Sequence, residues 1–207
     1  MPDKENRTFR ATAVVLRHVE FGEADRILTL FTLERGKIQA IAKGVRKIRS
    51  RKAGHLEPFT RVALFLAKGR NLAVVTQAEA LESYPGIRAD LQRTALAAYM
   101  VELLDRFSQE EGENRQLFHL LVDSLGRLNK DEQPETVVRY YEVQLLDLLG
   151  FRPELTYCVA CRAEIKPEDQ YFSARLGGAL CPRCAGHDPA AWRVSMTALK
   201  YLRYFQR

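Results

Sequence analysis

Four cysteines in two closely spaced pairs limit how the C-terminal part of this 207-residue chain can fold. Cys158 pairs with Cys161 and Cys181 with Cys184, and nineteen residues separate the two Cys-x2-Cys pairs. Each pair makes a tight turn that directs two sulfurs toward one point, so the two turns supply four thiolates for a closed tetrahedral zinc site. The segment is too short and too rich in turns to bury a core of its own. One structural Zn²⁺ is therefore predicted to fold it.

A closed tetrathiolate leaves no coordination position for water, so the predicted metal stabilises structure and does not activate a nucleophile. Two other interpretations of the cysteines stay open. Disulfides are one, although a cytosolic setting disfavours them. Iron in a rubredoxin-like centre is the other, and the turn from Cys181 to Cys184 would suit it. His187 could replace one thiolate, but a surface position is the simpler interpretation.

The first part of the chain shows a β-strand pattern. Between Phe9 and Leu81 the apolar residues come in short runs rich in Val, Ile, Leu, Phe and Thr, and glycines separate the runs. The five expected strands cover residues 9–19, 26–33, 37–43, 61–68 and 71–78. Five strands in about 75 residues favour a small closed barrel, and a five-stranded OB-fold is the leading candidate.

After Tyr84-Pro85-Gly86 the apolar period changes from two to about 3.6, which indicates helices. The second expected helix carries spaced leucines from Leu117 to Leu128, and the third begins at Pro134 and ends at Gly150. A last helix is expected over Ser195–Arg207 and could be cut short there. The first helix is expected to bury a broad apolar stripe of Leu91, Ala95, Leu96, Ala98, Met100, Leu103, Leu104 and Phe107.

The whole pattern predicts a multidomain α+β protein in four parts. Residues 1–82 form the OB-fold, 83–157 a helical domain, 158–188 the zinc ribbon, and 189–207 a closing helix that packs on the helical domain. Charge follows this division. Residues 1–80 hold sixteen basic and eight acidic side chains, whereas 81–157 hold eight and fourteen, within a net charge of +6. A polyanion would therefore meet the first part, and the acidic centre does something else.

Positive charge is densest between Arg35 and Lys52, a stretch with eight Lys and Arg and no carboxylate. Its first half alternates like a strand and runs through Gly44 into a cationic loop. A solvated surface loop is the alternative, but charge this local indicates a polyanion-binding site. No apolar run reaches membrane-spanning length and the N-terminus lacks a signal-peptide core, so a cytoplasmic protein is expected.

The usual marks of an enzyme are missing. The chain has neither the phosphate-loop motif G-x-x-x-x-G-K-[ST] nor the dinucleotide motif G-x-G-x-x-G, and His18, His55 and His119 are scattered. We therefore expect no enzymatic activity. Phe31, Phe59 and Phe65 fall in apolar runs and are expected in the core, so binding should be mainly electrostatic and indifferent to sequence.

The run Gly22-Glu23-Ala24-Asp25-Arg26 precedes Gly36-Lys37 and Lys43-Gly44-Val45-Arg46, and the stretch from Tyr141 to Pro153 leads into Cys158. These motifs, in this order along nearly the whole chain, resemble the RecO family of bacterial recombination mediators. The resemblance implies an N-terminal OB-fold, a central helical domain and a zinc ribbon in the C-terminal part. Some members of the family lack the cysteine pairs, so metal does not define the function.

The resemblance also implies a function. Family members bind single- and double-stranded DNA, anneal complementary strands and, with RecR, exchange single-stranded DNA-binding protein for the RecA recombinase, in the bacterial cytoplasm at the nucleoid. The acidic helical centre is the expected docking surface for protein, including the C-terminal tail of single-stranded DNA-binding protein. The predicted phosphate contacts, which would fix position and not read sequence, are Lys37, Lys43, Arg46, Lys47, Arg49, Arg51, Lys52 and Arg70. The competing hypothesis is a non-enzymatic RNA-binding or ribosome-associated protein, because a basic OB-fold with a zinc ribbon would suit RNA equally well.

Overall fold

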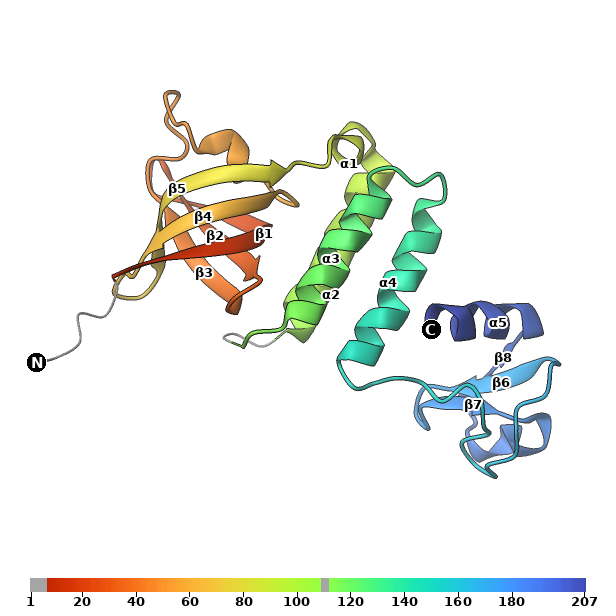
Figure 1. Ribbon diagram of the computed structural model, residues 1–207. Coiled ribbons are helices and arrows are strands. Elements are labelled where there is room, and N and C mark those ends of the chain that lie inside the picture. The colour runs from red at the N-terminus through yellow and green to blue at the C-terminus, as the bar shows by residue number, and fades with distance from the viewer. Residues whose placement is uncertain (1–6, 109–111) are drawn as a thin grey trace, which may run out of the picture. The chain divides into compact units, whose positions relative to one another are not determined.

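The computed structural model describes residues 7–108 and 112–207, which form two compact units with the boundary after Val138 (Figure 1). The first unit holds a β-barrel, helices α1 to α3 and the start of α4. The second holds the rest of α4, a small sheet and helix α5. The predicted barrel domain begins at residue 1, and its first six residues lie outside the described residues.

Five strands close into a barrel in the order β1-β2-β3-β5-β4. The strands are β1 (Thr8–Phe21), β2 (Asp25–Thr32), β3 (Gly36–Ala42), β4 (Arg61–Ala67) and β5 (Ala73–Glu82), and the short 3₁₀ helix η1 (Ala53–His55) precedes β4. The barrel closes through a short parallel pairing in which Ala40 lies opposite Ala73, whereas the other neighbours are antiparallel. The five predicted strands are confirmed, although β5 continues to Glu82.

Alternation along the strands separates the barrel core from its outer surface. In β4, Val62, Leu64 and Leu66 are buried, whereas Phe65 lies half-buried on the outer side. Phe31 is buried as expected, at 1% exposure. The expectation for Phe65 was wrong, because an apolar run does not by itself show which strand face is covered.

The helical segment follows the predicted boundaries. Its helices are α1 (Pro85–Ala89), α2 (Leu91–Phe107), α3 (Arg115–Leu128) and α4 (Pro134–Leu148). The Asp90 side chain accepts a hydrogen bond from the Arg93 N–H at 3.0 Å, and Asn114 accepts one from Leu117 at 3.0 Å. These two N-caps explain where α2 and α3 begin. The one-turn helix α1 was not predicted.

The predicted apolar stripe of α2 is partly wrong. Leu91 is 86% exposed and Phe107 is 53% exposed, and the buried residues are Ala97, Met100, Val101 and Leu104. The helix is apolar around much of its circumference, so periodicity left several faces possible. Packing against neighbouring elements selected one of them.

Two groups of contacts join the helices to the barrel within the first unit. Arg88 donates hydrogen bonds to the Pro58 carbonyl at 2.9 Å and to the Thr60 hydroxyl at 2.8 Å. Asp105 of α2 forms ion pairs with Arg17 at 3.2 Å and with Lys37 at 3.3 Å. The barrel is thus held to α1 and α2 by polar contacts as well as by chain connectivity.

The second unit contains a three-stranded antiparallel sheet in the order β7-β6-β8. Its elements are β6 (Gln170–Ser173), β7 (Gly178–Leu180), the 3₁₀ helix η2 (Pro182–His187), β8 (Trp192–Val194) and α5 (Met196–Phe205). Helix α5 confirms the predicted last helix, and its Phe205 ring meets Tyr140 of α4 edge-on with centroids 5.9 Å apart. A small core joins Leu155, Ile165, Leu180 and Leu199 to the cysteines.

Candidate functional site

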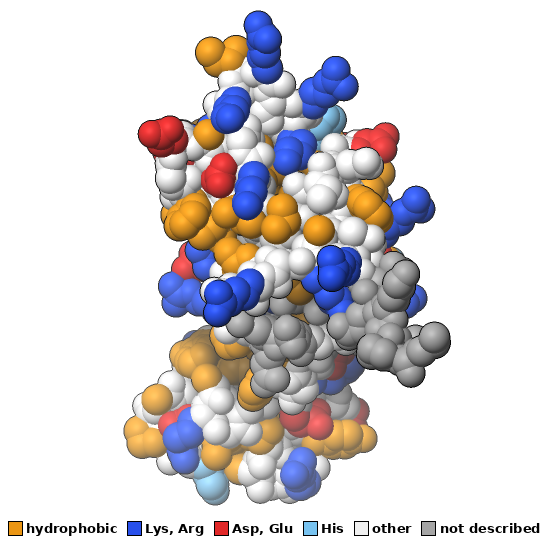
Figure 2. Space-filling model, turned by 90° about the vertical axis from the view of Figure 1, so that its left-hand side faces the viewer, with side chains coloured by type: hydrophobic (Ala, Val, Ile, Leu, Met, Phe, Trp, Pro, Cys, Tyr) orange, Lys and Arg blue, Asp and Glu red, His pale blue; other side chains and the backbone are white. Residues whose placement is uncertain are grey.

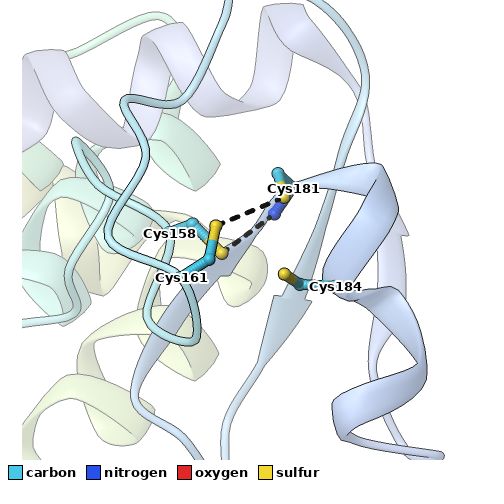
Figure 3. Close-up of side chains that lie close together, drawn as sticks. All are labelled: Cys158, Cys161, Cys181 and Cys184. Carbon is cyan, nitrogen blue, oxygen red and sulfur yellow. Dashed lines mark hydrogen bonds between the residues drawn. The ribbon is translucent and has the colours of Figure 1, made fainter.

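The four cysteines meet at one point in the second unit. Cys158 and Cys161 lie on one turn, which closes through a hydrogen bond from the Arg162 N–H to the Cys158 carbonyl at 2.9 Å. Cys181 follows β7 and Cys184 lies in η2, and the Cys184 N–H donates to the Cys181 carbonyl at 2.8 Å. Figure 3 shows the four sulfurs turned toward a shared centre.

The sulfur spacing suits one metal ion. All four Sγ atoms lie within 4.8 Å of one another, and those of Cys161 and Cys181 are 3.8 Å apart. Thiolates bound tetrahedrally to one zinc at about 2.3 Å would be separated by about 3.8 Å. All four thiols are free. The structure therefore brings together the four predicted ligands at positions from which they could hold a metal ion.

The electrostatics of the cluster also fit a cation. Burial raises the pKa of the Cys158 thiol, but hydrogen bonds from the N–H groups of Cys161, Cys181 and Ala160 lower it to about 6 overall. A hydrogen bond between the side chains of Cys184 and Cys181, together with burial and the other thiols, raises the pKa of Cys184 to about 12. Thiolates this close oppose one another's ionisation, and a divalent cation removes that conflict. His187 lies apart, with Nδ1 3.1 Å from the Cys184 carbonyl.

A second candidate site lies on the barrel, in the basic loop, which we define as residues 43–52. The Gly44 N–H donates to the Asp25 carboxylate at 2.7 Å, and the Arg46 N–H donates to the Ala24 carbonyl at 2.9 Å. Between them Val45 is buried in the barrel core at 1% exposure. These contacts hold the base of the loop against the barrel, and the tip of the loop extends beyond them.

The cations of the basic loop differ in how they are held. Lys43, Lys47, Arg49 and Arg51 are exposed and form no ion pair with a described residue. In contrast, Arg46 pairs with Glu20 at 3.1 Å and donates to the Glu23 carbonyl at 3.3 Å. Lys52 is half-buried and donates to the carbonyls of Lys43 and Val75. Figure 2 shows that Lys and Arg outnumber Asp and Glu over the barrel part of this face.

Two predicted phosphate contacts lie away from the basic loop. The Lys37 ammonium is 3.3 Å from the Asp105 carboxylate and 2.7 Å from the Asp105 carbonyl, and its side chain is 13% exposed. Arg70 is exposed in the turn between β4 and β5. Because Ala73 pairs with Ala40, that turn lies toward the start of β3, whereas the basic loop follows its end. The structure groups six of the eight residues, and the roles of all eight stay predictions.

A hollow of about 810 Å³ beside the basic loop was not foreseen. Arg51 and Lys52 line it together with strand residues of β1, β4 and β5. Strand register places Arg10 opposite Phe65 and Phe65 opposite Gln77, so these three form a row across the outer surface. Glu34 and Glu79 line it as well, and Glu34 accepts a hydrogen bond from the Thr12 N–H at 3.1 Å. The alternation along each strand could have indicated which residues face outward. Only the strand pairing shows that these outward-facing residues are neighbours.

The two sites together describe a barrel protein with a cationic loop and a cluster of four cysteines. Among the described residues, no helix combines the length and the apolar character needed to cross a bilayer. The exposed cations could contact phosphates of any sequence, because phosphate contacts fix position and carry no information about the bases.

Comparison with known proteins identifies the family. The family model for the recombination protein O N terminal matches residues 7–84, and that for the recombination protein O C terminal matches residues 88–207. Three relatives are named DNA repair protein RecO. The protein from Roseiflexus sp. is 44% identical over 97% of this chain and 71% of its own length. Those from Dehalococcoides mccartyi strain CBDB1 and Halalkalibacterium halodurans are 38% and 34% identical, over 96% and 95% of this chain and 78% and 76% of theirs. The chain belongs to the RecO family.

Proposed function

We propose that this chain is a DNA-binding mediator of recombination repair that binds single- and double-stranded DNA through its barrel. The observation that carries the proposal is the basic loop, in which Lys47, Arg49 and Arg51 are exposed and unpaired among the described residues on a base held by the barrel. Free cations on a loop that carries no carboxylate of its own attract phosphate backbones of any sequence. Relatives that share nearly the whole chain are named DNA repair proteins.

Annealing follows from the same charges. Two complementary strands repel one another as polyanions, and a protein that neutralises phosphates on both lowers the barrier to their encounter. Base pairing then supplies the free energy, so no nucleotide hydrolysis is needed and we propose no enzymatic activity. With RecR as a partner, the protein would help RecA replace single-stranded DNA-binding protein on DNA. The C-terminal tail of single-stranded DNA-binding protein would dock on the acidic helical segment.

The hollow beside the basic loop supplies a path for one strand. A strand whose phosphates contact Arg51 would pass over the outer surface of the barrel, where the half-buried Phe65 ring offers a face for a base. Aromatic stacking contributes about 1–3 kcal/mol per base in proteins that bind single strands. Glu79 at the rim limits how closely phosphates approach there, so phosphate contact is assigned mainly to the loop.

We further infer that the barrel is an OB-fold, because five strands in the order β1-β2-β3-β5-β4 with a parallel closure between β3 and β5 suit that fold. We also propose that the chain divides into four parts, with boundaries after residues 82, 157 and 188. Zinc would be held by Cys158, Cys161, Cys181 and Cys184, where it would stabilise the turns of the ribbon. A location in the bacterial cytoplasm, at the nucleoid, goes with this function.

The decisive experiment measures how DNA affinity depends on salt. The triple variant Lys47→Gln, Arg49→Gln, Arg51→Gln should bind oligo(dT) more weakly, and its slope of log affinity against log salt should become shallower by about 2, at about 0.7 per phosphate contact on a single strand. Annealing of complementary oligonucleotides should slow in parallel. The fold should be unchanged, because these side chains are exposed.

A matched control removes the same charge elsewhere. Arg106, Arg115 and Arg139 are exposed cations outside the barrel, and their triple change to Gln should leave the slope unchanged. If the loop variant keeps both its affinity and its slope, the loop is a solvated surface and the proposal fails. The competing RNA-binding function predicts that structured RNA displaces oligo(dT) efficiently and that annealing activity is absent.

A further inference from the structure

The tip of the basic loop carries an apolar side chain that phosphate binding does not explain. Ile48 is 105% exposed, more than any other large hydrophobic residue in the described chain. Isolated exposed hydrophobics are common on proteins. Ile48 differs because charged neighbours flank it, with Lys47 before it and Arg49 after it, and no carboxylate occurs between Arg35 and Lys52.

The loop presents this side chain in a defined turn. The Ser50 N–H donates to the Lys47 carbonyl at 2.8 Å, so Ile48 and Arg49 are the two central residues of a β-turn. The Lys47 N–H in turn donates to the Gly44 carbonyl at 3.2 Å. A β-branched side chain has few rotamers, so little conformational freedom is lost when it is buried in a partner.

We propose that Ile48 is a wedge that inserts between stacked base pairs of duplex DNA from the minor groove. This inference rests on the proposed DNA-binding function and deepens it. A two-residue turn is narrow enough to approach a groove about 6 Å wide, while the cations beside it reach the phosphates that border the groove. Apolar side chains such as Ile insert at base steps in other minor-groove proteins, where they unstack the step and kink the duplex.

Charge complementarity argues for DNA as the occupant and against an apolar protein surface. A protein partner that covered Ile48 would also have to desolvate or pair the side chains of Lys47 and Arg49 on either side. A duplex supplies phosphates for both cations and apolar base faces for the isoleucine. Loosening one base step would also assist a protein that works where paired and unpaired strands meet.

The test uses the full chain and a duplex oligonucleotide with 2-aminopurine at a single TA step, because this base fluoresces more strongly when it is unstacked and TA steps deform easily. The unmodified chain should raise the fluorescence on binding. The Ile48→Asn variant should not, and its affinity for the duplex should fall by about fivefold. Its affinity for oligo(dT) and its salt slope should stay within twofold of the unmodified chain, because no charge has changed.

The Ile48→Leu variant is the matched control, and it should keep the fluorescence rise because an apolar side chain of equal size is retained. Equal fluorescence with Ile48→Asn and the unmodified chain would overturn the wedge, as would binding of the duplex without any fluorescence rise. A chain that does not bind DNA at all, or whose binding is insensitive to loss of the loop charges, would instead refute the proposed function.

Discussion

At the scale of single residues, the same side chain does different work at different positions. Lys37 and Lys43 stand near the two ends of β3, and the sequence alone makes them equivalent candidates for phosphate contact. The structure separates them, because the Lys37 ammonium is bound to Asp105 and the Lys37 side chain is only 13% exposed, whereas Lys43 is exposed without an ion pair to a described residue. Contact with a neighbouring element thus decides what a cation can bind.

This difference makes a paired prediction. Lys37→Gln should lower the free energy of unfolding by about 1–2 kcal/mol, because a charged hydrogen bond and ion pair between β3 and α2 are lost, and should leave the salt slope of DNA binding unchanged. Lys43→Gln should leave the free energy of unfolding unchanged and make the salt slope of DNA binding shallower. Chemical denaturation and DNA titrations on both variants check this, and a shallower slope with Lys37→Gln would show that Lys37 leaves Asp105 to bind phosphate.

At the scale of elements, the ribbon and the basic loop gain their order from different sources. The loop is anchored through Val45, Asp25 and Ala24 on a barrel with its own apolar core. The ribbon segment, residues 158–188, shares a small core with Leu155, Val194 and Leu199 from outside it, and Cys158 and Cys184 are themselves packed in that core. Metal binding to four thiolates would therefore contribute a large part of the free energy that folds the ribbon.

For the ribbon we predict one zinc per chain, detected by elemental analysis after purification under reducing conditions. Cys181→Ser should abolish it, because three thiolates do not close the tetrahedron, and residues 158–188 should become sensitive to protease. His187→Ala should keep the metal, since its imidazole lies against the Cys184 carbonyl and outside the sulfur cluster. Disulfide-bonded cysteines or iron in place of zinc would contradict the prediction.

At the scale of the whole molecule, the chain divides into two compact units. The boundary after Val138 falls inside α4, so one helix contributes residues to both units. No change in the sequence pattern marks this boundary. Each unit has its own buried cluster among the described residues. Loss of order in one unit need not abolish the binding surface of the other.

Chelation of the intact protein tests this independence. Removal of the metal with 1,10-phenanthroline should expose the ribbon to trypsin and lower the unfolding temperature of the second unit, while the salt slope for oligo(dT) stays the same because its contacts lie on the barrel. Added zinc should restore resistance to trypsin. A large loss of DNA affinity on chelation would place part of the interface on the second unit.

Much of the architecture could be predicted because it depends on local periodicity. Apolar residues at a period of two indicated the five strands, and apolar residues at a period near 3.6 indicated the helices. Pro134 and Gly150 marked the two ends of the third expected helix. Cysteine spacing alone brought out the four candidate ligands, since a Cys-x2-Cys turn fixes its two sulfurs almost regardless of context. The six cations of the basic loop were found for the same reason, because they are neighbours in the chain.

Other features were decided only by tertiary structure. The buried face of α2, the outward position of Phe65, the row from Arg10 to Gln77 and the capture of Lys37 by Asp105 all depend on which elements pack together. Periodicity defines the faces of a strand or helix, but it does not say which partner covers each face. The sequence by itself therefore determined the elements and the chemistry of their local clusters, whereas strand pairing and packing decided which distant side chains are neighbours and which charges remain free.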